Sequence, residues 1–436
     1  MIELPHKNIR KEKLMSTNNY ITTLLNLKDP NLKFFEVAEE TVKGVAAIVV
    51  HGELSNKPKK CPHCGGLHIN IHGYKQSTIK IMPISGCNAL LRLNKQRYQC
   101  QCCKKTFVAE TSIVRRNCFI SNNVKYSAAL QATENISEKD IAKHLNISHN
   151  TVSRQINAFR DSYKVNYRYL PEVLCFDEFK STKDAAGAMS FIFCDAKEHK
   201  IIDIVENRQL KFLENYFSRY SKKARNSVKF IVMDMYKPYV TLAKKLFPRA
   251  KIIFDKFHII NNLSRALDKT RIMIMKKVDE KAYRKLKRYG RLLLKDRYEL
   301  DGIHFNRAYC FDKTVSQRDI VDCLLELDDE LKHTYFAYQD ILSALKQSDP
   351  TRLNSLVQQK NNNISGYMKT AIKTTKDNME YITNSVKYGY TNGIVEGFNN
   401  KIKALKRVAF GYRSFFNFRN RIMIMCNLIS IEKRCA

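Results

Sequence analysis

Three acidic residues that lie far apart in the sequence could together hold divalent cations. Asp177 ends a short apolar run, Asp234 ends another (FIVMD), and Glu396 lies in a helical segment 162 residues further on. If the two runs are neighbouring strands of one sheet, their terminal carboxylates meet, and a helix packed on that sheet adds the third. Two Mg²⁺ or Mn²⁺ ions, held about 3.5–4 Å apart by shared carboxylates, catalyse phosphoryl transfer because hard cations prefer oxygen ligands. The trio therefore predicts metal-dependent chemistry at a phosphate.

Several other acids compete for this role. Glu178 follows Asp177 directly, but neighbouring strand residues face opposite sides of a sheet, so only one of the two can enter such a site. Asp195 and Asp203 also end or interrupt apolar runs, where an aspartate is more often a turn residue than a ligand.

Asp255, in FDKFH, is the strongest rival among these acids. Its apolar run is expected to border the strand that ends at Asp234, and His258 follows Asp255 by one helical turn. Asp255 and His258 are therefore secondary candidates for the site.

Two pairs of cysteines indicate a second metal site. Cys61 with Cys64, and Cys100 with Cys103, have the spacing of zinc knuckles, in which each pair places two thiolates about one tetrahedral ion. The 35 residues between the pairs exceed the usual spacing of about 15–20, so the loop is expected to hold extra strands. Redox-active or incidental pairs are the alternative. The rival ligands are Cys102, His63, His68, His72 and Cys87.

Residues 137–156 carry a helix-turn-helix pattern. Ser137 followed by Asp140 resembles a capping box, with Asp in place of the usual Glu or Gln. Two apolar helical faces follow, formed by Ile141, Ala142, Leu145, Val152 and Ile156. The second helix of such a motif enters the major groove of DNA, and the alternative is an αα-hairpin that merely belongs to a core. The side chains offered to bases and phosphates are His149, Asn150, Ser153, Arg154 and Gln155.

Basic residues follow Glu396 at helical spacing, where a DNA backbone must run if its phosphate is to reach the cations. Such side chains contact phosphates and do not select the base sequence. A solvated charged face is the alternative for any one of them. They are Lys401, Lys403, Lys406 and Arg407.

An α/β sheet is expected to position the acids. Short apolar, β-rich runs alternate with amphipathic patterns between Pro171 and Lys256, and helices are expected at 210–220 and 238–246. A sheet of order 3-2-1-4-5 makes the first and fourth strands neighbours. The expected strands are VLCF (173–176), SFIFC (190–194), IIDIV (201–205), FIVM (230–233) and KIIF (251–254).

Shifts in composition divide the chain into six segments. These are a leader and β-rich segment (1–50), a zinc finger (51–110), a helix-turn-helix domain (111–165), the first part of the catalytic core (170–256), a helical insertion (257–385), and core helices that carry the third acid (386–436).

Charge and length limit the class of protein. The 436 residues include 76 Lys and Arg against 42 Asp and Glu, and the resulting net charge of +34 attracts polyanions. The first candidate for the binding partner is DNA or RNA, and the second is an anionic membrane. No apolar run reaches the about 18 residues that span a bilayer, and the Lys-rich start lacks the core of a signal peptide, which predicts a cytoplasmic protein. Met15 is an alternative start. The thirteen cysteines favour free thiols and a metal site over disulfides.

The order of these motifs resembles the DDE transposases of the insertion-sequence family usually written ISL-three, from about Lys33 to Arg434. The most specific of the matching segments is 392–422. The matching segments are CPHCG with RYQCQCCKKTF, CFDEF (175–179), VMDMYKPYV (232–240), FPRAKIIFDKFHI (247–259) and NGIVEGFNNKIKALKRVAFGYRSFFNFRNRI (392–422).

The resemblance implies a multidomain α/β protein. Its catalytic domain would be ribonuclease-H-like, with a mixed five-stranded sheet and an all-helical insertion, preceded by a zinc-ribbon-like finger and a helix-turn-helix. The implied catalytic acids are Asp177, Asp234 and Glu396. The implied ligands of a structural Zn²⁺ are Cys61, Cys64, Cys100 and Cys103.

The resemblance also implies a reaction and its partners. Water cleaves DNA at the ends of the element, and the freed 3′-hydroxyl then attacks target DNA. The partners would be double-stranded DNA, comprising terminal inverted repeats and target, and a second copy of the chain in the synaptic complex, with no membrane and no small-molecule substrate. A bacterial, nucleoid-associated protein is implied. A catalytically silent DNA-binding regulator and a host nuclease are the competing hypotheses.

Overall fold

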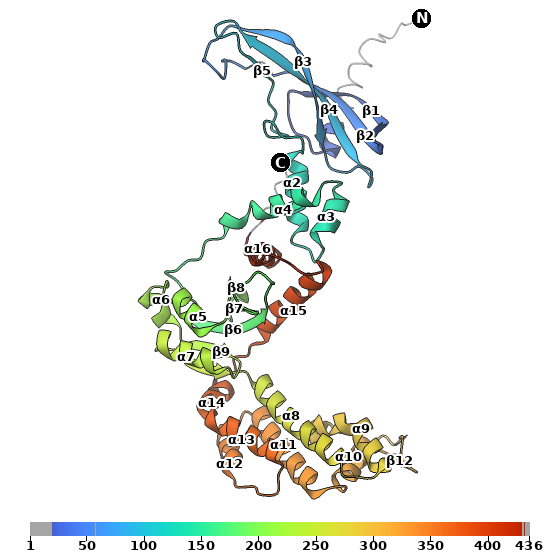
Figure 1. The fold of residues 1–436 in the computed structure, drawn as a ribbon, viewed down its shortest axis with the longest axis vertical. Coiled ribbons are helices and arrows are strands. Elements are labelled where there is room, and N and C mark those ends of the chain that lie inside the picture. Colours follow the sequence, from blue (N-terminus) through green and yellow to red (C-terminus); the bar gives the residue numbers. More distant parts are fainter. Residues whose placement is uncertain (1–19, 57, 430, 432–436) are drawn as a thin grey trace, which may run out of the picture. The chain divides into compact units, whose positions relative to one another are not determined.

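The computed structural model describes residues 20–56, 58–429 and 431, so the leader through residue 19, including Met15, lies outside the described residues. Figure 1 shows the elements of the chain, coloured along the sequence. Contacts within the chain divide it into two compact units. One unit comprises Met1–Lys164, Thr182–Asp184 and Ile402–Ala436, and the other comprises Val165–Ser181 and Ala185–Lys401.

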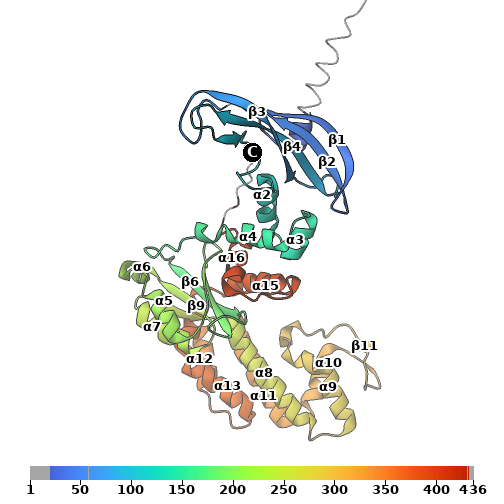
Figure 2. The same cartoon turned by 45° about the horizontal axis from the view of Figure 1, so that its top comes forward.

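A five-stranded sheet begins the first unit, and Figure 2 shows its four long strands. Their order is β1-β2-β4-β3, and β5 pairs with β4. Lys43 and Gly44 join β1 to β2 with φ values of 55° and 80°, the left-handed pair that a two-residue hairpin turn requires. β3 and β4 occupy the loop between the cysteine pairs, which confirms the extra strands expected there. The strands are β1 (Leu32–Val42), β2 (Val45–Leu54), β3 (Ile69–Lys80), β4 (Ala89–Cys100) and β5 (Thr106–Val108).

The helix-turn-helix follows this sheet in the same unit. Ser121, Ser137 and Ser148 precede its three helices, and each serine side chain accepts a backbone N–H of the first turn that would otherwise lack a partner. Ser137 Oγ also donates to the carboxylate of Asp140 at 2.6 Å, so the two residues of the predicted capping box are joined through their side chains. The helices are α2 (Asn122–Gln131), α3 (Glu138–His144) and α4 (His149–Asn157).

The C-terminal helix α16 (Phe415–Met425) packs against this motif. Asn420 Nδ2 donates to the carbonyl of Ile156 at 2.7 Å, and Arg421, which is fully buried, donates to two carbonyls in the turn between α2 and α3. The sequence grouped 386–436 with the catalytic core, whereas the structure places α16 with the helix-turn-helix. The physical reason is that a buried guanidinium needs acceptors, and that turn provides them.

A mixed five-stranded sheet forms the centre of the second unit. Its order is β8-β7-β6-β9-β10, with β6, β9 and β10 parallel and with β7 and β8 antiparallel. This confirms the order 3-2-1-4-5, all five strands and the ribonuclease-H-like α/β class. The strands are β6 (Val173–Lys180), β7 (Met189–Asp195), β8 (Lys200–Val205), β9 (Phe230–Met233) and β10 (Lys251–Phe254).

Helices cover both faces of this sheet. Because side chains alternate along a strand, Phe176 packs against Phe217 of α5 on one face, while Cys175 and Asp177 contact residues 391 and 399 on the other. The helices that flank the strands are α5 (Leu210–Phe217), α6 (Lys222–Ser227) and α7 (Lys237–Leu246), together with α15 (Gly393–Val408), which begins in the second unit and ends in the first.

The expected helical insertion follows β10 and is coloured yellow to orange in Figure 1. Within the described residues, no helix is long and apolar enough to span a bilayer. The insertion consists of α8 (Lys256–Met275), α9 (Glu280–Leu294), α10 (Gln317–Leu325), α11 (Asp329–Lys346), α12 (Pro350–Gln358), α13 (Gly366–Asp377) and α14 (Met379–Tyr388), with a short hairpin of β11 (Asn306–Arg307) and β12 (Thr314–Val315).

Candidate active site and zinc site

Two of the three candidate acids lie on adjacent strands. Asp234 directly follows β9, whereas Asp177 lies within β6, because the pairing of β6 with β7 continues to Lys180, beyond the strand end that the sequence predicted. The parallel register of β6 and β9 pairs Cys175 with Val232, so two residues further along each strand are Asp177 and Asp234. Burial and the neighbouring carboxylate of Asp234 raise the pKa of Asp177 to about 7. We call this end of the parallel strands, with Asp255 after β10, the acid edge.

Hydrogen bonds orient both oxygens of Asp177. Oδ1 accepts the backbone N–H of Glu178 at 2.8 Å, and Oδ2 accepts Nδ2 of Asn399 at 2.7 Å. Asp234 Oδ1 lies 3.0 Å from Nε2 of His258, and this contact raises the pKa of the imidazole. The candidate His258 therefore contacts Asp234, although it stands one helical turn after Asp255 in the sequence.

Asp255 has a structural role at the acid edge. Its side chain is buried, Oδ1 accepts the N–H of Phe257 at the start of α8, and Oδ2 accepts the N–H of Asn392 at 3.1 Å. Both oxygens are therefore occupied in a helix cap and in a contact with the residue that precedes α15.

The remaining rival acids have other partners. Glu178 faces the opposite side from Asp177, as predicted, and binds Arg208 and the hydroxyl of Tyr239. Asp195 accepts two backbone N–H groups of the turn after β7, and Asp203 accepts the hydroxyl of Tyr216. These hydrogen bonds and the ion pair with Arg208 stabilise the three carboxylates without a cation.

Glu396 lies in the first turn of α15 and is exposed. In the described part of the chain, the four cysteines below are the one group of three or more His, Cys, Asp or Glu ligand atoms gathered within 4.8 Å. The third acid is thus not in a closed cluster with Asp177 and Asp234. It lies on the helix whose Asn399 binds Asp177, three residues before that asparagine.

The raised pKa of Asp177 predicts a pH-dependent stability. Because the folded state binds more protons than the unfolded chain between about pH 4 and pH 7, the free energy of unfolding is expected to fall as the pH rises through this window. Asp177→Asn removes that titration. Without divalent cations in the buffer, it should stabilise the second unit at pH 7.5 by about 1–3 kcal/mol and have little effect at pH 4. Denaturant unfolding at both pH values measures this, and an equal effect at both would contradict it.

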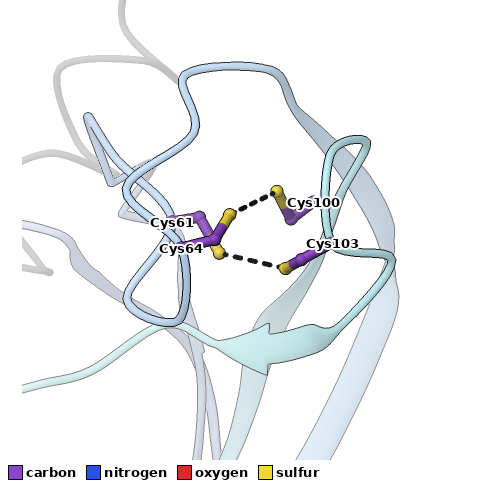
Figure 3. Close-up of side chains that lie close together, drawn as sticks. All are labelled: Cys61, Cys64, Cys100 and Cys103. Atoms are coloured by element: carbon purple, nitrogen blue, oxygen red, sulfur yellow. Dashed lines mark hydrogen bonds between the residues drawn. The ribbon is translucent and has the colours of Figure 1, made fainter.

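Four cysteines from two turns meet in the first unit (Figure 3). Their Sγ atoms all lie within 4.8 Å of one another, with 3.7 Å between Cys61 and Cys103 and 3.6 Å between Cys64 and Cys100. Backbone N–H groups of Cys103 and Cys102 lower the pKa of Cys100 to about 6, which favours the thiolate form that binds metal. Four sulfur donors at these separations suit a tetrahedral Zn²⁺.

The rival zinc ligands remain outside this cluster. A Cβ atom on Gly66 would come within 2.9 Å of Sγ of Cys102, so the exposed Cys102 lies directly beside the turn without joining the four. The ring of His63 packs edge-on against Phe107. Among the described residues, the rivals that do not enter the group are Cys102, His63, His68, His72 and Cys87.

The predicted DNA-facing residues differ in their exposure. His149, Asn150 and Arg154 of α4 are exposed, whereas Ser153 and Gln155 are half-buried. On α15, three of the four basic residues are exposed, and Lys406 is half-buried with its ammonium 5.7 Å from the ring of Phe418. The exposed ones are Lys401, Lys403 and Arg407.

Sequence reasoning missed two asparagines beside the acid edge. Asn392 and Asn399 are buried and donate to β6, at the carbonyl of Phe176 and at Asp177. The spacing of Asn392, Glu396 and Asn399, at i, i+4 and i+7, places all three on one helical face and was the signal that could have identified them.

Three family models match the chain in the order of these domains. Residues 57–103 match a zinc-finger of transposases IS204, IS1001, IS1096 and IS1165, and residues 109–160 match a helix-turn-helix domain of transposase family ISL3. Residues 174–422, more than half of the chain, match the ISL3 DDE model, described as a transposase. The zinc-finger match and the four-cysteine cluster support a structural zinc, and the helix-turn-helix match supports DNA binding.

Two curated proteins are similar to this chain. A protein of Lactococcus lactis called an ATP-dependent protease is 42% identical over 113 residues, which cover 25% of this chain and 35% of that protein. The transposase for insertion sequence element IS1001 of Bordetella parapertussis is 24% identical over 366 residues, which cover 81% of this chain and 85% of that transposase. The sequence contains no G-x-x-x-x-G-K-[ST] segment that would bind ATP, so we infer no ATP-dependent activity from the name of the Lactococcus lactis protein. With its catalytic segment matched over 174–422, the chain belongs to the ISL3 family of transposases.

Proposed function

We propose that this transposase cuts DNA at the ends of a bacterial insertion sequence and joins them to target DNA, with Asp177, Asp234 and Glu396 as catalytic acids. The observation that carries the proposal is the parallel pairing of β6 with β9, because its register brings Asp177 of β6 beside Asp234, the residue that follows β9. The place of Glu396 on α15, whose Asn399 binds Asp177, supports the third assignment.

The donor set at the acid edge fits two Mg²⁺ or Mn²⁺ ions. Carboxylate oxygens are the ligands that these cations prefer, and burial with the neighbouring Asp234, which raise the pKa of Asp177, disfavour its charged form unless a cation balances that charge. Bound there, the ions would polarise the phosphate and lower the pKa of the attacking water. His258, 3.0 Å from Asp234 Oδ1, would hold that carboxylate in one orientation.

Two reactions at phosphorus follow from this assignment. In cleavage, water attacks a phosphodiester at the element end and the bond between phosphorus and the 3′ oxygen breaks, which leaves a 3′-hydroxyl on the element. In strand transfer, that hydroxyl attacks a phosphodiester of the target and displaces a 3′ oxygen there. The acids would hold the divalent cations, whose positive charge would balance the negative charge that develops on the phosphate oxygens.

The remaining residues would hold the DNA. The exposed α4 residues His149, Asn150 and Arg154 are placed to contact bases and phosphates in the major groove, and the basic residues of α15 would contact the backbone. Two element ends must be held together before strand transfer, so the working complex contains at least two copies of the chain.

Purified protein incubated with labelled element-end DNA tests the proposal. With Mg²⁺ or Mn²⁺, nicks that carry a 3′-hydroxyl should appear at the element end, and adding a second duplex should yield joined products. Without divalent cations, neither product should form. Binding without cleavage in the presence of either cation would instead support a silent DNA-binding regulator, and cleavage without joining would support a nuclease.

A further inference from the structure

Two buried asparagines connect α15 to β6 on either side of Glu396. Asn392, with 3% of its surface exposed, donates from Nδ2 to the carbonyl of Phe176 at 3.1 Å. Asn399, with 4% exposed, donates from Nδ2 to Asp177 Oδ2 at 2.7 Å and to the carbonyl of Glu178 at 3.2 Å. Both amides thus bind residues 176–178 of the strand that carries the first acid.

The amide of Asn399 can have only one orientation in this environment. Its NH₂ group lies between two acceptors, and turning the amide over would place Oδ1 against the carboxylate of Asp177. In the observed orientation, Oδ1 is buried and has no hydrogen-bond donor among the described residues. An unsatisfied buried oxygen is destabilising, so stability alone does not favour asparagine at this position.

Asparagine has a specific advantage for holding a metal-binding carboxylate. Together with the N–H of Glu178, the amide gives each oxygen of Asp177 one donor, which fixes the plane of the carboxylate and leaves further lone pairs free. The amide is neutral, so it orients the acid without balancing its charge as a Lys or Arg would. A neutral donor therefore orients the ligand and does not compete with a cation for it.

The same contacts set the rotation of α15. At 3.6 residues per turn, positions 392, 396 and 399 fall within an arc of about 60°. The two amides bind β6, so the helical periodicity puts Glu396 on the same side of α15, where its side chain is exposed.

We propose that Asn399 is a positioning residue for the catalytic cations: it orients Asp177 and, with Asn392, fixes α15 so that Glu396 faces the acid edge. The proposal rests on the proposed function, in that the acids hold Mg²⁺ or Mn²⁺. Nothing in the family matches assigns a role to this residue.

Two substitutions of Asn399 test the proposal by direct measurement of Mn²⁺ binding. Asn399→Ala removes the donor, and Asn399→Leu removes it while nearly conserving side-chain volume. Zinc-loaded, full-length protein is titrated with Mn²⁺ by calorimetry and by electron paramagnetic resonance, and Asp234→Ala identifies the part of the signal that belongs to the acid edge. We expect Mn²⁺ to bind about 10-fold or more weakly in both variants. The Mn²⁺ concentration that gives half-maximal cleavage should rise by a similar factor.

Asn400→Ala is the matched control, because Asn400 is the adjacent residue of α15 and is exposed. It should bind Mn²⁺ like the wild type.

Thermal unfolding separates a positioning role of Asn399 from a purely structural one. A positioning role predicts that Asn399→Leu unfolds at nearly the wild-type temperature and still binds Mn²⁺ weakly. Wild-type Mn²⁺ affinity in Asn399→Leu, or unfolding of both Asn399 variants under the assay conditions, would overturn the proposal. If the wild type binds Mn²⁺ at the acid edge but cleaves no DNA, the proposed function fails. The Mn²⁺ affinities of the Asn399 variants and the wild type would still decide whether Asn399 is a positioning residue.

Discussion

Asp177→Asn and Asp234→Asn are each expected to reduce strand cleavage by at least about 10³-fold while element-end binding stays within a few-fold of the wild type. Asparagine keeps the shape of the side chain but removes the charge that holds a divalent cation, and the electrostatic stabilisation of the transition state is lost with it. The binding residues of α4 lie in the other compact unit, so they should be unaffected. Cleavage of labelled element-end DNA and gel-shift titration with the same DNA measure the two quantities.

The loss expected for these variants has a matched control in the same sheet. Asp195 also ends a strand, but its carboxylate accepts backbone N–H groups of a turn, a role that asparagine can partly fill. Asp195→Asn should therefore cleave DNA at close to the wild-type rate. Wild-type cleavage by Asp177→Asn or Asp234→Asn would remove that residue from the catalytic set.

Glu396→Gln is expected to abolish cleavage in the same way, because glutamine carries no charge to hold a divalent cation. Retained cleavage in this variant would mean that another residue is the third catalytic acid. Asp255 would then be the next candidate, because it lies at the acid edge. The observed contacts of Asp255 with Phe257 and Asn392 predict instead that Asp255→Ala chiefly destabilises the start of α8 and the approach to α15.

Cys61→Ser is expected to remove zinc from the protein and to unfold the finger around the four cysteines. Structural zinc sites of this kind contribute about 10–16 kcal/mol of binding free energy, which is folding free energy when the site exists only in the folded state. Cys61 and Cys100 are buried in the apolar core of this sheet, so loss of the ion also exposes that core. Zinc content by mass spectrometry should fall by one ion per chain, and element-end binding should weaken.

Cys102→Ser is the matched control for the loss of zinc expected in Cys61→Ser. Cys102 lies between two ligands in the sequence and beside Gly66 in space, but it stands outside the cluster. Its serine variant should keep the zinc and the DNA affinity of the wild type. Unchanged zinc content in Cys61→Ser would mean that the finger assignment is wrong. In either variant, a divalent cation should still bind at the acid edge, because that site is in the other unit.

The elements of this protein could be predicted because their signals are local. The five strands of the second unit are short apolar runs, and each occurs where its own residues predict it. The four clustered cysteines come from two turns, each with cysteines three residues apart, and this spacing is what predicted a metal site there. The serine caps of α3 and α4 are likewise contacts between residues three positions apart.

Which acids face one another could not be read from the sequence with the same certainty. Asp255 and Asp234 end neighbouring strands in equivalent ways, and only the tertiary contacts of Asp255 with Phe257 and Asn392 distinguish a helix cap from a ligand. His258 illustrates the same limit: its sequence neighbour is Asp255, but its partner in space is Asp234.

The order of the domains, the five strands of the second unit, the two cysteine pairs and the candidate acids could be predicted from the sequence, because each depends on residue types and spacings within one element or turn. The contact of Asn399 with Asp177, 222 positions away, and the burial of Arg421 of α16 against the helix-turn-helix could not, because they depend on the folded structure. Such contacts depend on how whole elements pack, and a buried amide or guanidinium acquires its partners only when distant segments come together and exclude water.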